Sequence, residues 1–326
     1  MKYLITGGCG FIGSNFIRAL LVEEPEAQVF NIDLLTYAGN RVTLADVEEH
    51  FLGRYAFEQL DIADQNAMEK LFQAERFDFV INFAAESHVD RSIAQPQSFI
   101  RTNVLGTSVL LECCKKFGIQ RFVQVSTDEV YGSLDEGKFT EKSPILPSSP
   151  YSASKAAADH LALAYFKTYG LDVVITRCSN NYGPYQFPEK LIPLMIIKAM
   201  RDEPLPVYGD GLNVRDWIYV LDHCSAVKAV LDRGRAGDIY NIGADGELKN
   251  LQVVKIILRH LGKPEELIRF VTDRLGHDRR YAIDSSKLRN ELGWQPTHAP
   301  ENGICSTVDW YVKNRNWWEP LLQEST

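Results

Sequence analysis

The sequence has no excess of positive charge, and this absence limits the partners that the chain can bind. Lys and Arg number 35 against 43 Asp and Glu, which gives a formal net charge of -8 in a chain of 326 residues. A general binder of nucleic acid or of an anionic membrane surface needs a cationic field. The composition therefore argues against both partners, although a small anionic ligand needs only a local cluster of donors.

Long apolar runs and clustered cysteines are also lacking. No apolar run reaches the roughly 18 residues that a membrane helix needs, and Met1 is not followed by the basic and apolar stretches of a secretory signal. The cysteines match neither a zinc-site spacing nor a dense disulfide framework. We therefore expect a cytoplasmic protein with reduced thiols, no membrane segment and no bound metal. The cysteines are Cys9, Cys113, Cys114, Cys178, Cys224 and Cys305.

Short apolar runs alternate with longer amphipathic ones through the first half of the chain. The short runs predict strands, and because they are apolar throughout, they favour a parallel sheet that is covered on both faces. The alternation of strand and helix predicts a doubly wound, Rossmann-type α/β fold. Strands are expected at Tyr3–Thr6, Gln28–Ile32, Tyr55–Leu60, Phe79–Phe83, Phe122–Val125 and Val173–Arg177, and helices at Phe11–Val22, Gln65–Gln73, Ser98–Phe117 and Tyr151–Tyr169.

The pattern changes after about Asn180. The stretch Asn181–Pro193 is rich in Pro, Asn, Tyr and Gly, which is typical of irregular segments that form a binding surface. We predict a Rossmann domain over residues 1–180 and a smaller C-terminal substrate-binding domain over 181–326. The boundary is soft, because Trp217–Leu231 could form a helix that returns to the first domain, within a return segment near 217–245.

A glycine-rich turn follows the first expected strand. Its glycines are spaced G-x-x-G-x-x-G, at Gly7, Gly10 and Gly13. Such glycines let pyrophosphate approach the backbone, and the N-terminus of the following helix faces the phosphates. Asp33 lies at the end of the second strand, where a carboxylate can bind the ribose hydroxyls of NAD and would repel the extra phosphate of NADP. The alternative is a plain turn between strand and helix, and Arg41 leaves NADP open.

Two more turns fit the same cofactor cleft. Asp61 and Ile62 follow the third strand, where an Asp can meet the adenine edge. Phe83, Ala84 and Ala85 follow the fourth strand, where small side chains leave room for a dinucleotide. Both turns lie at the carboxyl ends of parallel strands, where open α/β sheets bind ligands. Asp61 could equally cap a helix.

Tyr151 and Lys155 lie four residues apart at an expected helix start, behind Ser149 as cap and Pro150 in the first turn. The spacing places both side chains on one helical face. Because a nearby ammonium stabilises a phenolate, we expect Lys155 to lower the pKa of Tyr151 and make it a base near neutral pH. The alternative is an ordinary surface pair, which the dinucleotide turn in the same chain disfavours.

A hydroxyl and two carboxylates follow the fifth expected strand, at Thr127, Asp128 and Glu129. At the end of a parallel strand they should face the same cleft as the cofactor. Neighbouring carboxylates in a desolvated cleft tend to have their pKa values pushed apart, which would leave one protonated acid and one ionised base. The alternative is a solvated loop in which Asp128 caps a turn.

With these motifs in place, the chain resembles the dTDP-glucose 4,6-dehydratase family of the extended short-chain dehydrogenase/reductase superfamily. The resemblance spans nearly the whole chain. The glycine turn and the Y-x-x-x-K pair are shared by the whole superfamily, whereas the Thr-Asp-Glu triplet is specific, since related 4-epimerases lack the acid pair. The segments that carry the resemblance are Gly7–Gly13, Asp33–Asn40, Ala85–Ser92, Thr127–Gly132, Tyr151–Lys155, Arg177–Pro184 and Gly276–Tyr281.

The resemblance implies a lyase that removes water from a nucleotide sugar, with dTDP-glucose favoured, and an NAD that stays bound and is recycled in each turnover. Tyr151, assisted by Lys155, takes the proton of the sugar 4-hydroxyl while hydride leaves C4. Glu129 then removes the C5 proton and Asp128 protonates the departing 6-hydroxyl. Hydride returns to C6, and Thr127 hydrogen-bonds the 4-oxygen. The product is a 4-keto-6-deoxy sugar.

The resemblance also implies a homodimer and a set of binding residues. The dimer would form through the helices around Val104–Phe117 and Tyr151–Tyr169. Arg215 is a sensible phosphate ligand because its guanidinium can bind two oxygens at once. The implied cofactor contacts are Gly7, Gly10, Phe11, Ile12, Gly13, Asp33, Leu34, Thr36, Asp61, Ile62, Phe83, Ala84, Ala85, Ser87, Thr102, Tyr151, Lys155 and Asn181, and the implied substrate contacts are Ser87, Thr127, Asn180, Lys190, Leu191, Pro206, Tyr208, Arg215, Asn250, His277 and Tyr281.

Other functions stay open at this point. A UDP-sugar 4,6-dehydratase or a nucleotide-sugar 4-epimerase would use the same scaffold, but epimerisation needs no base at C5 and therefore no Glu129. A non-catalytic NAD-binding protein would have little reason to keep Tyr151, Lys155, Asp128 and Glu129 together. The nucleotide base, whether of dTDP, UDP or GDP, is left open by the sequence.

Overall fold

The computed structural model describes residues 1–273 and 279–323. Seven parallel strands form its main sheet, in the order β10-β6-β5-β4-β1-β2-β3. The chain order reverses between β1 and β4, and ligands bind at such a point in open α/β sheets. The predicted Rossmann-type sheet is confirmed. Its strands are β1 (Lys2–Thr6), β2 (Gln28–Asp33), β3 (Tyr55–Gln59), β4 (Phe79–Asn82), β5 (Arg121–Thr127), β6 (Val173–Cys178) and β10 (Ile239–Ile242).

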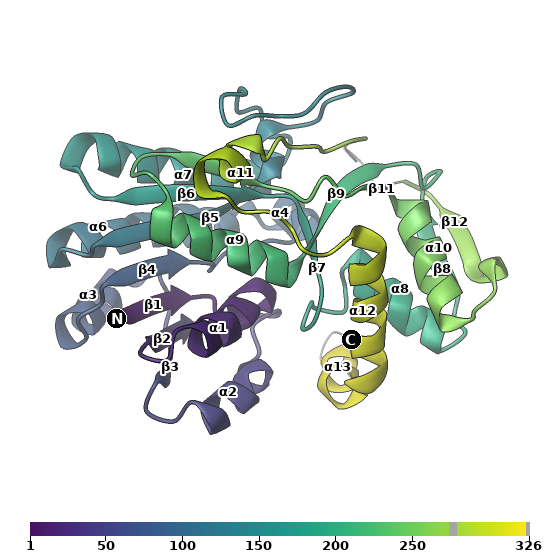
Figure 1. Ribbon diagram of the computed structural model, residues 1–326, viewed down its shortest axis with the longest axis horizontal. Helices are drawn as coiled ribbons and strands as arrows, with labels where there is room; N and C mark the ends of the chain where they lie inside the picture. Colours follow the sequence, from purple (N-terminus) through teal and green to yellow (C-terminus); the bar gives the residue numbers. More distant parts are fainter. Residues whose placement is uncertain (274–278, 324–326) are drawn as a thin grey trace.

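Helices cover both faces of the main sheet, as Figure 1 shows. On one face Ile17 and Val227 pack into a shared apolar core, and on the other face Leu71 and Leu110 do so. Strands β5 and β6 are buried along almost their whole length, which explains their continuous apolar sequence. The helices of the first face are α1 (Phe11–Glu23), α2 (Ala45–His50), α9 (Val220–Arg233) and α11 (Ser286–Leu292), and those of the second are α3 (Gln65–Ala74), α6 (Thr107–Phe117) and α7 (Pro150–Tyr169).

Two of the expected helices show how local sequence sets their ends. Helix α7 begins behind Ser149, whose hydroxyl accepts a hydrogen bond from the Ser152 backbone nitrogen at 3.1 Å, and ends at Gly170, which has φ +70°. The helix expected at Ser98–Phe117 is divided into three consecutive segments, in which a π-helical turn separates two α-helical ones. These are α5 (Pro96–Phe99), η2 (Ile100–Gly106) and α6.

A smaller lobe carries its own apolar core, in which Tyr182, Ile257 and Val308 are fully buried. Among the described residues, no helix is both long and apolar enough to cross a membrane. The strands of the lobe are β7 (Asn180–Tyr182), β8 (Leu205–Tyr208), β9 (Val214–Tyr219), β11 (Glu247–Lys249) and β12 (Ile268–Val271), and its helices are α8 (Leu191–Met200), α10 (Asn250–Leu261), η4 (Glu265–Leu267), α12 (Pro300–Lys313) and α13 (Arg315–Gln323). Three short helices belong instead to the turns of the main sheet: η1 (Arg41–Leu44), α4 (Val89–Ala94) and η3 (Asp128–Tyr131).

The chain crosses between the lobe and the main sheet more than once. Helix α9 packs against α1, and β10 then pairs with β6 at the edge of the main sheet. The prediction of a helix over the whole of Trp217–Leu231 is wrong for its first three residues. Trp217–Tyr219 pair with β7 as part of β9, because an aromatic and β-branched segment fits a pleated, buried surface better than a helix start.

Candidate active site

The turn between β1 and α1 brings glycines against neighbouring backbone. Gly7 has φ +69°, and a Cβ atom there would lie 2.6 Å from the backbone nitrogen of Ala84. A Cβ atom on Gly13 would lie 2.5 Å from the carbonyl oxygen of Gly7. Larger residues therefore do not fit at these two positions without displacing the turn. The tight turn leaves the start of α1 lining a cleft, as binding of a pyrophosphate requires.

Asp33 ends β2 beside this turn and is fixed by backbone donors. Its Oδ2 accepts a hydrogen bond from the Cys9 nitrogen at 3.0 Å, and its Oδ1 accepts one from the Leu35 nitrogen at 2.8 Å. Burial raises the pKa of this carboxyl group. Arg41 forms an ion pair with Glu48, with 2.8 Å between Nε and Oε1. Because Arg41 already has this partner, it is a weaker candidate for binding the extra phosphate of NADP.

A cleft of about 340 Å³ opens at the carboxyl ends of the sheet strands. Every residue that the sequence assigned to the cofactor lines this cleft, from Gly7 in the first turn to Asn181 in β7. The narrow glycine turn at one end and the buried Asp33 beside it fit a dinucleotide with two ribose units. The assignment of each single contact stays a prediction.

The five proposed catalytic side chains line the same cleft. Thr127 is the last residue of β5 and caps the N-terminus of η3. Its hydroxyl accepts a hydrogen bond from the Glu129 backbone nitrogen at 3.2 Å. Asp128 is buried within η3, while Glu129 is half-buried. On α7, Tyr151 hydrogen-bonds to Thr127, and the Lys155 ammonium donates to the Val125 carbonyl at 2.7 Å. The strand end and the helix start thus bring together residues that lie far apart in the sequence.

Burial controls the protonation of this group. Desolvation, and then the charge of Glu129, raise the pKa of Asp128 well above its ordinary value, so this group is the acid of the pair. Its Oδ2 atom is buried and has no hydrogen-bond partner in the part of the chain that the structure describes. The carboxylate pair thus has the asymmetry that an acid beside a base requires.

The expected effect of Lys155 on Tyr151 is wrong for the protein alone. Desolvation and the charge of Glu129 raise the pKa of Tyr151 well above its ordinary value, although its hydrogen bond with Thr127 acts in the other direction. Desolvation also lowers the pKa of Lys155. The spacing correctly placed both side chains on one face, but it could not show that burial outweighs the attraction between them.

The turn that carries the two carboxylates is fixed by contacts with β10 and with the loop that follows the turn. The Tyr131 hydroxyl donates to Asn241 Oδ1 at 2.8 Å, and its ring stacks on Phe139 with 5.1 Å between centroids. Asn241 Nδ2 in turn donates to the Phe139 carbonyl at 3.1 Å. Strand β10 and the loop after η3 therefore fix the position of the catalytic turn.

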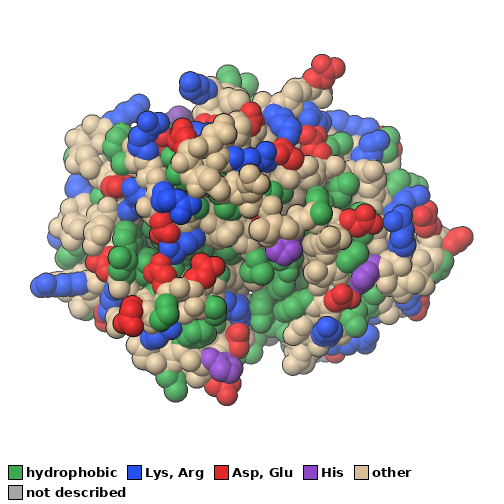
Figure 2. Space-filling model, viewed as in Figure 1, with side chains coloured by type: hydrophobic (Ala, Val, Ile, Leu, Met, Phe, Trp, Pro, Cys, Tyr) green, Lys and Arg blue, Asp and Glu red, His purple; other side chains and the backbone are tan. Residues whose placement is uncertain are grey.

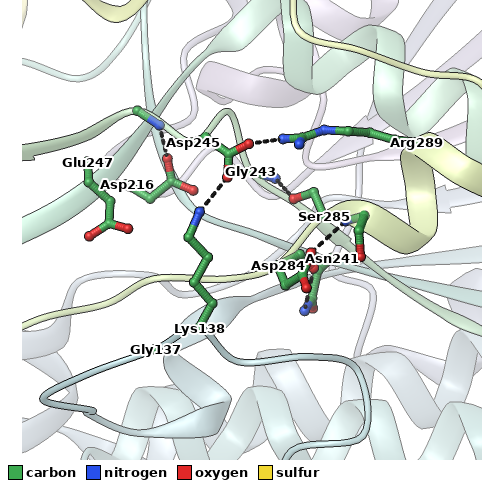
Figure 3. A network of polar contacts seen from close by, with 12 residues as sticks. Gly137, Lys138, Asp216, Asn241, Gly243, Asp245, Glu247, Asp284, Ser285 and Arg289 are labelled. Atoms are coloured by element: carbon green, nitrogen blue, oxygen red, sulfur yellow. Dashed lines mark hydrogen bonds and ion pairs between the residues drawn. The ribbon is translucent and has the colours of Figure 1, made fainter.

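The same loop also reaches the smaller lobe, as Figure 3 shows. Lys138 Nζ lies 2.5 Å from Asp245 Oδ1, and Asp245 pairs with Arg289 as well. Beside them Asp216 is fully buried, and its Oδ1 accepts a hydrogen bond from the Gly246 nitrogen at 2.7 Å. This network joins the loop after the catalytic turn to strands β9 and β11.

The predicted substrate residues fall into two groups. Ser87, Thr127, Asn180 and Lys190 line the cleft. The other described ones do not line it: Arg215 lies over the Tyr281 ring at 4.5 Å, and its charge lowers the pKa of Asp128. His277 lies outside the described residues. The described residues that do not line the cleft are Leu191, Pro206, Tyr208, Arg215, Asn250 and Tyr281.

Several cleft residues were not singled out from the sequence. Tyr37 lies within a segment whose resemblance was noted, and Gln186, Phe187 and Glu189 lie in the stretch rich in Pro, Tyr and Asn. That composition was the only signal for the second group. Other such residues are Ile32, Ala38, Gly39, Leu60, Glu86, Val125, Ser126, Cys178 and Ser179.

Comparison with known proteins identifies the family. A family model described as GDP-mannose 4,6 dehydratase matches residues 4–307. A dTDP-glucose 4,6-dehydratase of Xanthomonas campestris pv. campestris (strain B100) is 53% identical over 342 residues, covering 99% of this chain and 96% of its own. The chain belongs to the dTDP-glucose 4,6-dehydratase family. A relative of the same description from Escherichia coli is 48% identical over 355 residues, covering 100% of this chain and 97% of its own.

Solved structures show how this dehydratase family relates to its neighbours. A dTDP-glucose 4,6-dehydratase from Streptomyces venezuelae, crystallised with NAD bound, is 51% identical, has a TM-score of 0.94 and covers 98% of this chain and 100% of its own. A UDP-glucose 4-epimerase from Thermotoga maritima is 29% identical with a TM-score of 0.90, and covers 97% of this chain and 100% of its own. The resemblance inferred from the motifs is confirmed. Because both activities share the scaffold, the side chains in the cleft must decide between them.

Proposed function

We propose that the protein is a dTDP-glucose 4,6-dehydratase, an NAD-dependent hydro-lyase that converts dTDP-glucose into dTDP-4-keto-6-deoxyglucose and water. The observation that carries this proposal is the acid pair Asp128 and Glu129 beside Tyr151 and Lys155 in one cleft. The choice of sugar nucleotide is supported by relatives that are named dTDP-glucose 4,6-dehydratase. These relatives share about half of their residues with this chain over nearly their full length.

The first half of the reaction is an oxidation at C4. The glycine turn and Asp33 would hold NAD, which would supply the acceptor for the C4 hydride and its donor to C6, and whose positive charge would favour the phenolate of Tyr151. Tyr151 takes up the proton of the sugar 4-hydroxyl, and Thr127, which already hydrogen-bonds Tyr151, holds the same oxygen. Lys155 is fixed by the Val125 carbonyl and supplies a nearby positive charge.

The second half is an elimination across C5 and C6. The 4-ketone makes the C5 proton acidic, and Glu129 removes it as general base. Asp128, whose raised pKa favours its protonated form, donates a proton to the departing 6-hydroxyl through Oδ2, which has no hydrogen-bond partner among the described residues. Water leaves with both electrons of the C6–O bond. The return of hydride to C6 and of a proton to C5 completes the product.

Binding of the sugar nucleotide involves both parts of the molecule. Lys190 and Asn180 line the cleft and are suited to the sugar and the diphosphate. We assign Arg215 to the phosphates, although it must reach them from β9 behind the cleft. Leu191, Pro206, Tyr208, Asn250, His277 and Tyr281 complete the proposed nucleotide contacts.

The assembly and the location of the enzyme are part of the same proposal. Leu105 and Tyr169 are exposed hydrophobic side chains at the two helices expected to form a homodimer, with 46% and 54% of their surface accessible. All six cysteines are free, as expected in a reducing cytoplasm. Sedimentation of the purified protein would test the homodimer directly.

The test is to incubate the purified enzyme separately with dTDP-, UDP- and GDP-glucose. We expect dTDP-glucose to give a product that absorbs in alkali as a 4-keto sugar, and in heavy water we expect one deuterium at C5. A product that differs from the substrate only in the configuration at C4 would show epimerisation and contradict the proposal. Faster turnover of UDP-glucose would keep the dehydratase reaction and replace its substrate.

A further inference from the structure

We propose that Tyr185 is a positioning residue that anchors a strap, Tyr185–Lys190, which retains the dinucleotide in the cleft throughout turnover. The proposal rests on the proposed function, because a redox-neutral cycle must return hydride from the same cofactor that accepted it. The strap supplies four lining residues of the cleft: Gln186, Phe187, Glu189 and Lys190.

The anchored end of the strap lies where the two parts of the molecule meet. The Arg18 guanidinium of α1 lies over the Tyr185 ring at 4.1 Å from its centroid. On its other sides the ring packs edge-on against Trp310 of α12 at 4.7 Å and Trp317 of α13 at 5.3 Å. Figure 2 shows hydrophobic side chains gathered on this face between the region of α1 and that of α12 and α13. One ring therefore joins the cofactor-binding helix to both C-terminal helices.

The backbone of the anchor is fixed as firmly as its ring. Tyr185 has φ +66°, a left-handed conformation that a large side chain seldom adopts and keeps only where its surroundings require it. Asn15 Nδ2 of α1 donates to the Pro184 carbonyl at 3.0 Å, directly before it. Directly after it, the Gln186 carbonyl accepts a hydrogen bond from the Tyr311 hydroxyl. Contacts on both sides thus impose the conformation.

The far end of the strap touches the opposite wall of the cleft. The Phe187 ring meets the Tyr37 ring edge-on at 5.7 Å, and Tyr37 follows the dinucleotide-side strand β2. Glu189 Oε2 lies 3.5 Å from His88 Nε2, in the turn after β4. Because Tyr37, Phe187 and Glu189 all line the cleft, the strap forms part of its lining between the anchor and this wall. On this proposal, a bound dinucleotide must displace the strap in order to leave.

The test measures cofactor retention in the absence of substrate. The full-length enzyme, Tyr185→Ala and Tyr185→Phe are saturated with NAD, passed through gel filtration in NAD-free buffer, and assayed for NAD that remains bound. We expect Tyr185→Ala to release NAD on the order of tenfold faster, since it loses one cation–π and two aromatic contacts. Tyr185→Phe should retain NAD, because the ring makes these contacts. Added NAD should restore turnover in Tyr185→Ala.

Three outcomes would overturn the proposal. If Tyr185→Ala retains NAD as well as the unmodified enzyme does, Tyr185 has no role in retention. If excess NAD does not restore the activity of Tyr185→Ala, the residue is merely structural. If Tyr185→Ala does not fold, Arg18→Met removes the cation above the ring, together with the ion pair to Asp46 and the hydrogen bonds to the Ser14 and Thr43 carbonyls. It should still speed NAD release, whereas unchanged release would refute the anchor. Asp46→Asn, which removes the ion pair of Arg18 but keeps the cation, is the control. Since no sugar nucleotide is present when NAD retention is measured, that measurement is independent of whether the proposed reaction is correct, and only the restoration of turnover depends on it.

Discussion

The two halves of the cleft are built in different ways. Most of the proposed contact residues of the cofactor half lie at the ends of β1, β2, β3 and β4 or in the turns that directly follow them, whereas Thr102 lies in η2 and Tyr151 and Lys155 lie on α7. The proposed substrate half gathers lining residues from separate elements, such as Thr127 at the end of β5, Asn180 in β7 and Lys190 before α8. The further proposed contacts Arg215 on β9 and Asn250 at the start of α10 do not line the cleft. A strand followed by a tight turn is a local feature of sequence, whereas the second arrangement depends on how distant elements pack.

The dominant physical constraint also differs between the halves. In the cofactor half it is steric, since Gly7 and Gly13 leave no room for a Cβ atom. Around the substrate half it is electrostatic, since Arg215, Asp216 and Asp128 are buried close enough for their charges to influence one another. Changes in the first half should therefore affect NAD binding, and changes in the second should affect the sugar and its chemistry.

The largest effect is expected at Glu129, which stands between the halves. Glu129→Gln keeps the shape of the side chain but removes the base, so turnover should fall by about 10²- to 10⁴-fold. NAD binding and sugar-nucleotide binding should both persist, while exchange of the C5 proton with solvent should stop, as measured by deuterium incorporation. Glu136→Gln, on an exposed part of the following loop, serves as control. Undiminished C5 exchange would remove Glu129 from its role.

Gly13→Ala tests the steric constraint of the cofactor half. Its added methyl group would lie 2.5 Å from the Gly7 carbonyl oxygen, so the turn must shift at a cost of about 1–3 kcal/mol. We expect weaker NAD binding by fluorescence titration, with partial recovery of activity at high NAD. Gly118→Ala strains a left-handed backbone but meets no atom within 4 Å, so it should lower stability and leave NAD affinity unchanged. Equal loss of NAD affinity in both variants would contradict the steric argument.

The same contrast explains what could be predicted from the sequence. The glycine turn, Asp33 and the spacing of Tyr151 and Lys155 are local patterns, and all of them line the cleft. The path of Gln186 and Phe187 depends on the left-handed backbone at Tyr185, which contacts with α1, α12 and α13 impose. No local periodicity encodes such a conformation.

Burial also limited what the sequence could predict about the pKa of a catalytic side chain. Lys155 was expected to lower the pKa of Tyr151, but desolvation has the larger effect and raises it. The degree of desolvation depends on how α7 packs over β5, which a motif does not contain. The segment Trp217–Tyr219 was likewise ambiguous, because its pairing partner in β7 lies far away in the sequence. Fold class and residue identity were therefore predictable, whereas the pKa of Tyr151 and long-range pairing were not.

Arg215→Lys tests the substrate half with a smaller change. Lysine keeps the charge but loses the guanidinium that can bind two phosphate oxygens, so KM for dTDP-glucose should rise about tenfold. The NAD content of the purified enzyme should not change, because Arg215 does not line the described cleft. Arg259→Lys, in an exposed ion pair with Glu301, provides a matched control. A fall in NAD content would show that the two halves are not separable.

Asp216→Asn should give the smallest effect, a displacement of the pH profile. The pKa of Asp216 is raised to about 6 by burial, so the group is ionised above that pH, and its charge raises the pKa of Asp128. The amide removes this charge while still accepting from the Gly246 nitrogen. The pKa of Asp128 should then fall, although desolvation and the charge of Glu129 still raise it.

Because Asp128 acts in its protonated form, a lower pKa means that the acid is lost at lower pH. The alkaline limb of the kcat profile should therefore move to lower pH in Asp216→Asn, while Asp210→Asn, on the surface beside Arg279, should leave it in place. A shift toward higher pH would reverse the sign of the coupling. If the alkaline limb does not move, a group other than Asp128 sets the alkaline limit of kcat. The charge of Asp216 then has no influence on the reaction.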